Sequence, residues 1–488
     1  MANFIYRRDE IKAFEISEKE IKTRITQDMS RRVQFAERKQ ILRDQIKPII
    51  DKQLSYMFSL DTYQDMRPYI DATNNLMRRV IREISTVYKE EPLRTVSPKS
   101  NQKLYEEITS KMNFNEKMSR ANYLLNGVND LIFQVVNLGN GIDLNILTPD
   151  MITVFENADN PTVLDAILIE DFYFDAKGEK VTQWIYWSPT RHFIVDNNFR
   201  IRAIDGNDGL ENPYRELNIV TDQFYPFVDV HASDREDSFF DMYSGSDLVD
   251  STKLVAIQST FRNFMIPMQF KQIAVKVQGI DEGKAIKNNQ VKSPLHMVTA
   301  NGDIQVLDWQ SDIKQLGDEI QNQIFSIATN YGISAENFKL TAAPVSGFAR
   351  LVAKERLSEI RQEQIKIWRA VESRLFDAIR VTNNLYNIGT QISESAKFMI
   401  DFKEPKNIED PINEVQIIKE KLQLGIINLL EVIKESNPDL KTDEEAEEFL
   451  NKNIEIRNKL QRRFGLNFDE LLKTPQAGQR QGAFNGQA

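Results

Sequence analysis

The residue types that most often carry enzyme chemistry are scarce in this sequence. Its 488 residues include no cysteine, which excludes disulfides, cysteine-zinc sites, iron-sulfur clusters and thiol catalysis. The three histidines, His192, His231 and His296, are spaced unlike HExxH or any similar metal motif, and no G-x-S-x-G nucleophile elbow occurs. Each histidine is therefore predicted to be structural. No catalytic residue, cofactor or metal ion is expected, although carboxylates paired only by folding would escape this test.

Two glycine-containing segments begin like ligand loops without completing them. Residues 279–285 echo a phosphate-binding loop, but the glycines are one residue too close and Ala285 replaces the Ser or Thr that holds magnesium. Residues 205–216 start like a calcium loop and place Glu216 at the twelfth position. Gly209 at the fifth position has no side-chain oxygen, and Pro213 stiffens the ninth. Both segments are predicted to be ordinary turns.

A carboxylate cluster surrounds Arg235. Its members are Asp234, Glu236, Asp237 and Asp241, a set that in principle could hold a hard cation for phosphoryl chemistry. A metal site needs rigidly placed ligands, and few periodic apolar residues anchor this stretch. The pattern favours a solvated loop.

Charge and hydropathy limit the classes of protein to which this chain can belong. With 62 Lys and Arg against 72 Asp and Glu, the net charge is −10, so no globally basic surface is available for nucleic acid. The first fifteen residues mix charges and contain no apolar signal region, and no run of eighteen apolar residues occurs. We expect a soluble protein of a cytoplasm-like compartment, without a membrane partner.

Hydrophobic periodicity changes along the chain. Residues 1–89 read as amphipathic helices, for example through Met77, Val80, Ile81 and Ile84, and a breaker-rich joint around Pro92 and Pro98 leads to a helix that ends at Gly127. Between 130 and 226, short β-branched and aromatic runs alternate with turn residues: LIFQVVN, DLNILTP, MITVF, AILIEDFYF, VTQWIYW, HFIVD and RIRAI. This pattern predicts an antiparallel sheet region of about six to eight strands.

Two long helices are predicted on either side of a small module. The first spans 244–266 and is stopped by Pro267, and the second spans 308–331 with Ile313, Leu316, Ile320, Ile324, Ile327 and Tyr331 on one stripe. The segment 269–307 between them reads as a mixed αβ insertion with a hairpin at Asn301-Gly302. A loop and a very long helix, 348–386, follow.

The C-terminal part returns to short helices. Residues 415–424 and 426–434 are helical in pattern, and Thr442 to Glu445 has the spacing of a capping box that opens an acidic helix. The last fifteen residues are of low complexity and are expected to be disordered.

This order of elements resembles the portal proteins of tailed bacteriophages, the head-to-tail connector family. The resemblance rests on LTPDMITV at 147–154, SGSDL at 244–248, the αβ insertion, SGFA at 346–349 before the very long helix, and LGII at 424–427 with NPDL at 437–440. It covers roughly residues 100–460, and its support lies in the order of the segments, since no single motif is specific to the family.

The resemblance implies a mixed α+β, predominantly helical fold with a β-rich wing, a two-helix stem, an αβ clip, a long spine helix and a helical crown. The expected divisions are an N-terminal helical part of the wing at 1–126, a β-rich wing at 127–243, stem helices at 244–268 and 308–331, a clip at 269–307, a tunnel loop at 332–347, a long wing helix with a return strand at 348–409, a crown at 410–470 and a disordered tail at 471–488.

For function, the resemblance implies a ring, usually of twelve copies, at one capsid vertex, through which double-stranded DNA is packaged and ejected without sequence specificity. The implied partners are the terminase large subunit, which carries the packaging ATPase, the head-tail adaptor, and the major capsid and scaffolding proteins. The implied location is the virion, and the host cytoplasm during assembly. Motor and adaptor docking would fall on clip residues Lys276, Asp281, Glu282, Lys284, Lys287, Asn301, Gly302 and Asp303. The DNA would pass Lys339, Leu340, Thr341, Ala342, Ala343, Pro344, Val345 and Ser346 of the tunnel loop.

Two other classes remain open from the residues alone. One is a non-enzymatic helical adaptor or scaffold protein of a virion, without a DNA channel. The other is a hydrolase whose carboxylates meet only in the fold. A closed ring with a central pore would favour a portal over an adaptor or scaffold protein. Activity assays with nucleotide and nuclease substrates would test for a hydrolase.

Overall fold

The fold is described from a computed structural model. It describes residues 16–157, 159–204, 210–221, 223–235, 237–269, 272–275, 295–297, 305–307, 313–333, 347–386, 390–402, 418–425, 427–437, 440 and 442–464. The chain divides into two compact units, Met1–Glu404 and Pro405–Ala488. Among the described residues, 56% are helical and 17% lie in strands, which confirms a mixed, mainly helical fold.

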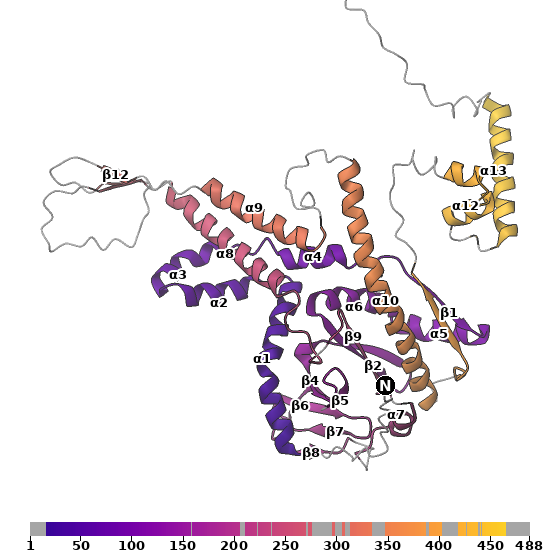
Figure 1. The fold of residues 1–488 in the computed structure, drawn as a ribbon, viewed down its shortest axis with the longest axis horizontal. Helices are drawn as coiled ribbons and strands as arrows, with labels where there is room; N and C mark the ends of the chain where they lie inside the picture. The colour runs from indigo at the N-terminus through magenta and orange to yellow at the C-terminus, as the bar shows by residue number, and fades with distance from the viewer. Residues whose placement is uncertain are drawn as a thin grey trace, which may run out of the picture. The chain divides into compact units, whose positions relative to one another are not determined.

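Four α-helices and a short 3-10 helix open the first unit (Figure 1). They are α1 (Glu18–Leu42), α2 (Lys47–Met57), α3 (Leu60–Met66), η1 (Arg67–Tyr69) and α4 (Leu76–Ile84). The predicted stripe on α4 is confirmed, because Met77, Val80, Ile81 and Ile84 are all buried. α1 begins at a capping box in which Ser17 and Glu20 satisfy each other's backbone N–H groups.

The joint before residue 100 contains a strand that the sequence pattern did not predict. β1 (Leu93–Ser97) pairs antiparallel with β13 (Lys397–Asp401), about 300 residues further along the chain. Two helices follow β1, α5 (Lys99–Lys111) and α6 (Phe114–Val128), and α6 ends with Asn129 in the left-handed conformation. This pairing joins the start of the chain to its return after the long helix.

The predicted antiparallel region is confirmed almost strand by strand. It forms β2 (Asp130–Asn137), β3 (Ile142–Leu147), β4 (Ile152–Glu156), β5 (Leu164–Phe174), β6 (Lys180–Trp187), β7 (His192–Val195) and β8 (Ile201–Arg202), with η2 (Pro149–Met151) before β4 and α7 (Arg215–Thr221) and β9 (Phe227–His231) after β8. These strands make two sheets, a three-stranded sheet in the order β3-β2-β9 and a five-stranded meander β4-β5-β6-β7-β8. These strands could be predicted because their runs are rich in β-branched and aromatic residues and are bounded by turn residues. Burial does not alternate along all of them, since six consecutive residues of β2 are buried.

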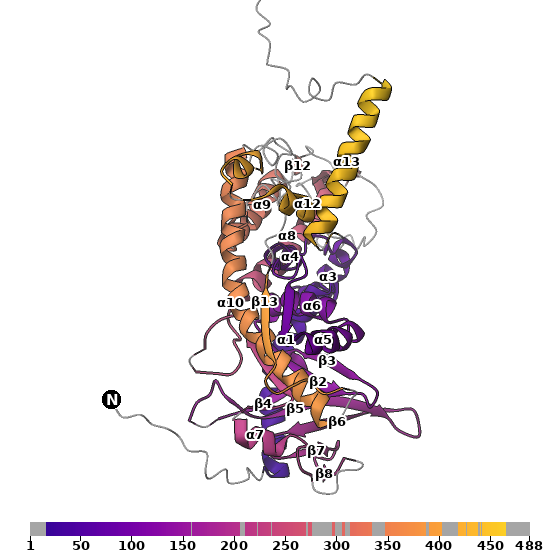
Figure 2. The same ribbon diagram turned by 90° about the vertical axis from the view of Figure 1, so that its right-hand side faces the viewer.

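Helix α10 (Gly347–Leu385) confirms the predicted very long helix and packs on β9, β2 and β13 (Figure 2). Its second half is buried through Ile365, Trp368, Val371, Leu375, Phe376 and Ile379. One charged residue, Glu372, lies fully buried in that apolar face. Its carboxylate accepts hydrogen bonds from Arg94 of β1, at 2.6 and 2.8 Å, and from the hydroxyl of Tyr88 at 2.9 Å. This ion pair ties α10 to the β1–β13 strand pair.

In the second unit, α12 (Leu429–Ser436) and α13 (Asp443–Phe464) pack against each other. Both helices begin at capping boxes, formed by Asn428 with Glu431 and by Thr442 with Glu445. The predicted box at Thr442 is thereby confirmed. The helix expected at 426–434 is displaced along the chain, because Asn428 caps it and its first residue is Leu429.

Candidate functional site

The candidate site is the pair of helices α8 (Ser246–Gln269) and α9 (Ile313–Asn330) with the small sheet that the chain forms between them (Figure 1). α9 packs along α8 and buries Ile320, Ile324 and Ile327, which confirms the centre of the predicted stripe. Tyr331, just after α9, donates a hydrogen bond of 2.9 Å to Asp247 in the first turn of α8. The end of one helix therefore lies beside the start of the other, as in an antiparallel hairpin.

Pro267 lies inside α8, and the prediction that it stops the helix is wrong. A proline removes one backbone hydrogen bond and crowds the preceding turn. In the last turn the cost is limited, because few residues follow it and the final turn of a helix leaves some carbonyls unpaired in any case.

The insertion between α8 and α9 forms a sheet, whereas Asn301-Gly302, where a hairpin was predicted, lies outside the described residues. β10 (Gln272–Val275) lies in the middle, parallel to β11 (Leu295–Met297) and antiparallel to β12 (Gln305–Leu307). β11 and β12 are therefore not neighbours. Because β11 and β12 pair with opposite edges of β10, the backbone groups on both edges of β10 form hydrogen bonds. If β11 and β12 paired with each other as a hairpin, at least one edge of β10 would lack a partner strand.

Most of the predicted functional residues lie outside the described residues. This applies to the clip residues Lys276, Asp281, Glu282, Lys284, Lys287, Asn301, Gly302 and Asp303, and to the tunnel-loop residues Lys339 to Ser346. It also applies to the loop at 279–285 and to 205–209 of the calcium-like segment, whereas Glu216 lies in α7. The geometry available for the site is that of α8, α9 and their attachment to the first unit.

The described faces of the helix pair carry few cations. On α9 the exposed charged side chains are Lys314, Asp318 and Glu319. On α8, Asp247 and Asp250 are exposed, while Lys253 binds Glu37 of α1 at 2.9 Å and Asp250 at 3.1 Å. No continuous row of lysines or arginines runs along the described part of either helix. This surface does not favour tight binding of phosphate.

Two buried threonines attach α8 to the N-terminal helices. Thr252 Oγ1 accepts the backbone N–H of Met77 at 2.9 Å, and Thr260 Oγ1 accepts that of Asp71 at 3.0 Å. Each hydroxyl donates its own proton to a carbonyl four residues earlier in α8. Beside them, Ala256 and Ile257 pack in one apolar cluster with Ile46, Ile50 and Leu54.

Replacing Thr252 by valine tests this attachment. Thr252→Val keeps the shape but leaves the buried N–H of Met77 without an acceptor, so we expect a loss of about 1–3 kcal/mol in the free energy of unfolding. Urea denaturation measures it. The matched control is Thr329→Val on α9, whose exposed hydroxyl bonds only its own helix at Phe325 and which should change stability by no more than about 0.5 kcal/mol. Equal losses in the two variants would contradict the assigned role.

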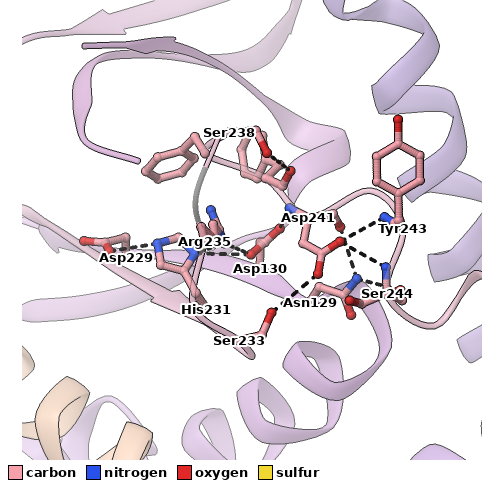
Figure 3. Close-up of polar contacts among 12 residues, drawn as sticks. Asn129, Asp130, Asp229, His231, Ser233, Arg235, Ser238, Asp241, Tyr243 and Ser244 are labelled. Carbon is pink, nitrogen blue, oxygen red and sulfur yellow. Dashed lines mark hydrogen bonds and ion pairs between the residues drawn. The ribbon is translucent and has the colours of Figure 1, made fainter. Parts of the chain in front are cut away.

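The loop that leads into α8 is held by a buried polar network (Figure 3). Asp130, at the start of β2 and 1% exposed, binds the guanidinium of Arg235 and accepts the backbone N–H of Asp241 at 2.8 Å. His231 lies between Asp130, at 3.2 Å from Nδ1, and Asp229, at 2.9 Å from Nε2. The β2–β9 pairing places Asp130 directly opposite His231, so the sheet register assembles the network.

The next turn is fixed by side chains that bond the backbone. Asp241 accepts the N–H groups of Tyr243 and Ser244, at 2.9 and 3.0 Å (Figure 3). Asn129 donates to the carbonyls of Asp241 and Ser244, and Arg38 of α1 donates to the carbonyl of Ser244 at 2.8 Å. These bonds set the direction in which the chain enters α8.

The interpretation of this stretch as a solvated loop is therefore wrong for Arg235 and Asp241. Arg235 has only 6% of its side chain exposed and pairs with Asp130, a residue outside the predicted cluster, while Glu236 lies outside the described residues. The spacing of residues around Arg235 could not predict this ion pair. Asp130 lies about 100 residues earlier in the sequence and is brought close by the pairing of β2 with β9. Within the described ranges, no group of three or more His, Asp or Glu side chains is arranged to hold a metal ion.

Two histidines have shifted pKa values of opposite direction. Burial lowers the pKa of His192, which stacks on Trp187, to about 4. Burial also disfavours the charged form of His231, but hydrogen bonds to Asp130 and Asp229 outweigh it and raise the pKa of His231. Both residues make structural contacts, as predicted; the side chain of His296 in β11 is outside the described residues.

The raised pKa of His231 predicts a pH-dependent stability. Because its folded-state pKa lies above the unfolded value of about 6.5, its contribution is fully present below that value and is lost as the pH rises through the folded pKa. We expect the stability difference between the wild type and His231→Gln to shrink from pH 6 towards pH 9. Urea denaturation across this range measures it, and parallel curves for the two proteins would contradict the prediction.

An arginine-bearing hollow that the sequence analysis did not identify lies at the start of α4. It has a volume of about 300 Å³ and is lined by Asp44, Thr73, Asn75, Arg78, Arg79, Arg82 and Glu83. Arg78 pairs with Asp44 at 2.6 Å, so part of its charge is matched within the hollow. In the sequence, the only indication of this hollow is the adjacent pair Arg78 and Arg79 on the polar side of the predicted helix.

Comparisons with known proteins were made at three levels. No family model matches the sequence, and no curated protein matches it. Among solved structures, a chain from the virion of a native gene transfer agent (GTA) particle is similar, at 13% identity and a TM-score of 0.37, over 78% of this chain and 94% of that one. A chain from the neck of an empty GTA particle computed with C6 symmetry is similar at 11% identity and a TM-score of 0.37, over 76% and 92%.

Among the helices of the described residues, none combines the length and the apolar character that crossing a bilayer requires.

Proposed function

We propose that this protein is the portal of a tailed-phage-like particle, a ring of about twelve copies around a DNA channel at one capsid vertex. The observation that carries the proposal is the antiparallel helix pair α8–α9, which brackets a three-stranded sheet and is built on a β-rich body with a 39-residue helix. This is the order of elements from which the sequence resemblance to portal proteins was drawn. It supports an architectural role over a catalytic one.

In this proposal α8 and α9 form the stem around the channel, and residues 269–307 form the clip. The clip, through the residues Lys276 to Asp303 named above, is the docking surface for the terminase large subunit and later for the head-tail adaptor. Residues 335–347 are the tunnel loop that faces the DNA, α10 is the spine of the wing, and residues from about 410 are the crown.

The charge distribution of the helix pair supports a passage through which DNA slides. Each phosphate that a fixed cation neutralises adds affinity with a salt slope of about −0.9, so a ring of many such cations would grip a duplex. The described faces of α8 and α9 carry no cation row, and the tunnel segment Lys339 to Ser346 contains one lysine. Twelve copies at −10 sum to −120, which opposes tight retention of DNA.

Negative-stain electron microscopy of the purified full-length protein tests the proposal directly. The expected result is a closed ring of about twelve subunits with a central pore. A stable monomer under all conditions, measured by light scattering after gel filtration, would overturn it. Assembled protein without a pore would favour the remaining alternative, a non-enzymatic adaptor or scaffold of a virion.

Duplex binding by the assembled rings gives a second prediction. We expect weak binding that changes little between about 50 and 200 mM salt, because few phosphates are neutralised. Fluorescence anisotropy of a labelled duplex measures it, with the single substitution Lys339→Ala as a variant that should change little further. Tight binding with a steep salt dependence would count against a sliding channel.

A further inference from the structure

The second unit fully buries very few of its described apolar side chains. Ala446 is the one apolar residue beyond 405 that is buried among the described residues. Leu429 is 48% exposed, Ile454 and Ile456 are each 47% exposed, and Leu460 is 37% exposed. A unit of this size needs a larger core to be stable by itself. These exposed apolar side chains are therefore not covered by the described part of the second unit.

The uncovered residues are concentrated in the second half of α13. At about 1.5 Å per residue, the eight residues of α12 span roughly 12 Å and the 22 residues of α13 roughly 33 Å. Around the packed residue Ala446, Phe449 and Leu450 are half-buried, whereas Ile454, Ile456 and Leu460 follow on the same broad side and are exposed. α12 thus covers only the beginning of that side.

Charge is divided between the same two halves of α13. The first nine residues carry Asp443, Glu444, Glu445, Glu447 and Glu448, and the remainder of the helix carries Lys452, Arg457, Lys459, Arg462 and Arg463 with one acid, Glu455. The helix dipole favours acids at the start and bases at the end, but only within the first and last turns. Acids reach the sixth residue of α13 and bases begin at the tenth, so the division extends beyond what the dipole explains.

We propose that the second half of α13 packs on the α12 and α13 first half of a neighbouring copy of this chain. The neighbour would cover Ile454, Ile456 and Leu460, and its acids would face Lys452, Lys459 and Arg462. Each copy then uses its acidic half towards one neighbour and its basic half towards the other. Such a head-to-tail contact closes into a ring when the rotation between copies permits. The proposal rests on the ring proposed above.

Disulfide trapping tests the contact cleanly, because the chain contains no cysteine. Glu447 and Asn458 are exposed, lie eleven residues apart and, at 100° per residue, point to nearly the same side of α13. Their separation of about 16 Å far exceeds disulfide reach, so a Glu447→Cys/Asn458→Cys chain can crosslink only between copies. The single variants are matched controls and should not crosslink in a head-to-tail contact.

The expected result, on mild oxidation and non-reducing electrophoresis, is a ladder of crosslinked species beyond the dimer. A product that stops at the dimer indicates a two-fold antiparallel pair and overturns the proposal. Rings in negative stain without a ladder overturn it and leave the proposed function standing, whereas the absence of both overturns both. With Glu444→Lys/Glu448→Lys in the double-cysteine chain, crosslinking should fall, and it should recover when this chain is mixed with a double-cysteine chain that carries Lys452→Glu/Lys459→Glu.

Discussion

Replacing Glu372 by alanine should lower the free energy of unfolding by about 3–5 kcal/mol, the range for removing one partner of a buried ion pair. Glu372 is fully buried, and Arg94 has 9% of its side chain exposed. Glu372→Ala leaves the Arg94 guanidinium without its counter-charge in the core and the Tyr88 hydroxyl without its acceptor. Most of the expected loss comes from that uncompensated charge.

Urea denaturation followed by tryptophan fluorescence measures this loss, since Trp368 packs edge-on against Tyr88 at 5.3 Å. The matched control on the same helix is Glu359→Ala, which breaks an exposed pair with Arg356 at 2.7 Å. Exposed pairs contribute roughly 0–1 kcal/mol, so the control should stay within that range. If both variants lost the same amount, Glu372 would not be the link between α10 and β1.

Replacing Asp130 by asparagine should have an effect of similar size, about 3–5 kcal/mol, because Arg235 then lies buried without a counter-charge. Asparagine keeps the shape and can still accept the N–H of Asp241. The change also removes a group that raises the pKa of His231, so that pKa should fall. We expect the turn at 241–244 to loosen, which faster amide hydrogen exchange at Tyr243 and Ser244 would report.

Asp143→Asn is the control for Asp130→Asn. Asp143 lies on the neighbouring strand β3 and pairs with Lys117, and both side chains are partly exposed, at 33% and 26%. Its loss should cost no more than about 1 kcal/mol and leave exchange at Tyr243 unchanged. A second chain with Asp130→Asn and Arg235→Met should recover much of the stability, because it removes the unpaired buried charge and keeps an acceptor for the N–H of Asp241. If Asp130→Asn left the stability unchanged, the buried ion pair between Asp130 and Arg235 would not contribute to stability as predicted.

The elements that could be predicted from sequence are those with a local pattern. Strands β2 to β8 are runs of β-branched and aromatic residues between clear turns, and α4 and α10 carry apolar residues at helical spacing. The pairing of β1 with β13 has no such pattern, because its partners lie about 300 residues apart. The strand order β11-β10-β12 could not be predicted either, because such short strands can pair in several orders and the sequence does not indicate which one forms.

The site was harder to predict than the elements that hold it. Asp130 reads as the polar first residue of a strand, and only the β2–β9 register shows that it meets His231 and Arg235. Glu372 did leave a signal: it is a charge among Trp368, Leu375 and Phe376 on the apolar side of a helix. A charged residue in such a position is rarely buried without a partner, so a distant arginine was to be expected.

The attachment of α8 has a consequence for how the helix pair responds to its ionic surroundings. Thr252 and Thr260 hold α8 through neutral hydrogen bonds to buried backbone N–H groups, whereas the link from Lys253 to Glu37 is partly exposed. Dissolved salt screens charges near the surface over about 8 Å at physiological ionic strength, but it barely affects a buried neutral hydrogen bond. The base of α8 should therefore keep its position when the counterion concentration around it rises or falls.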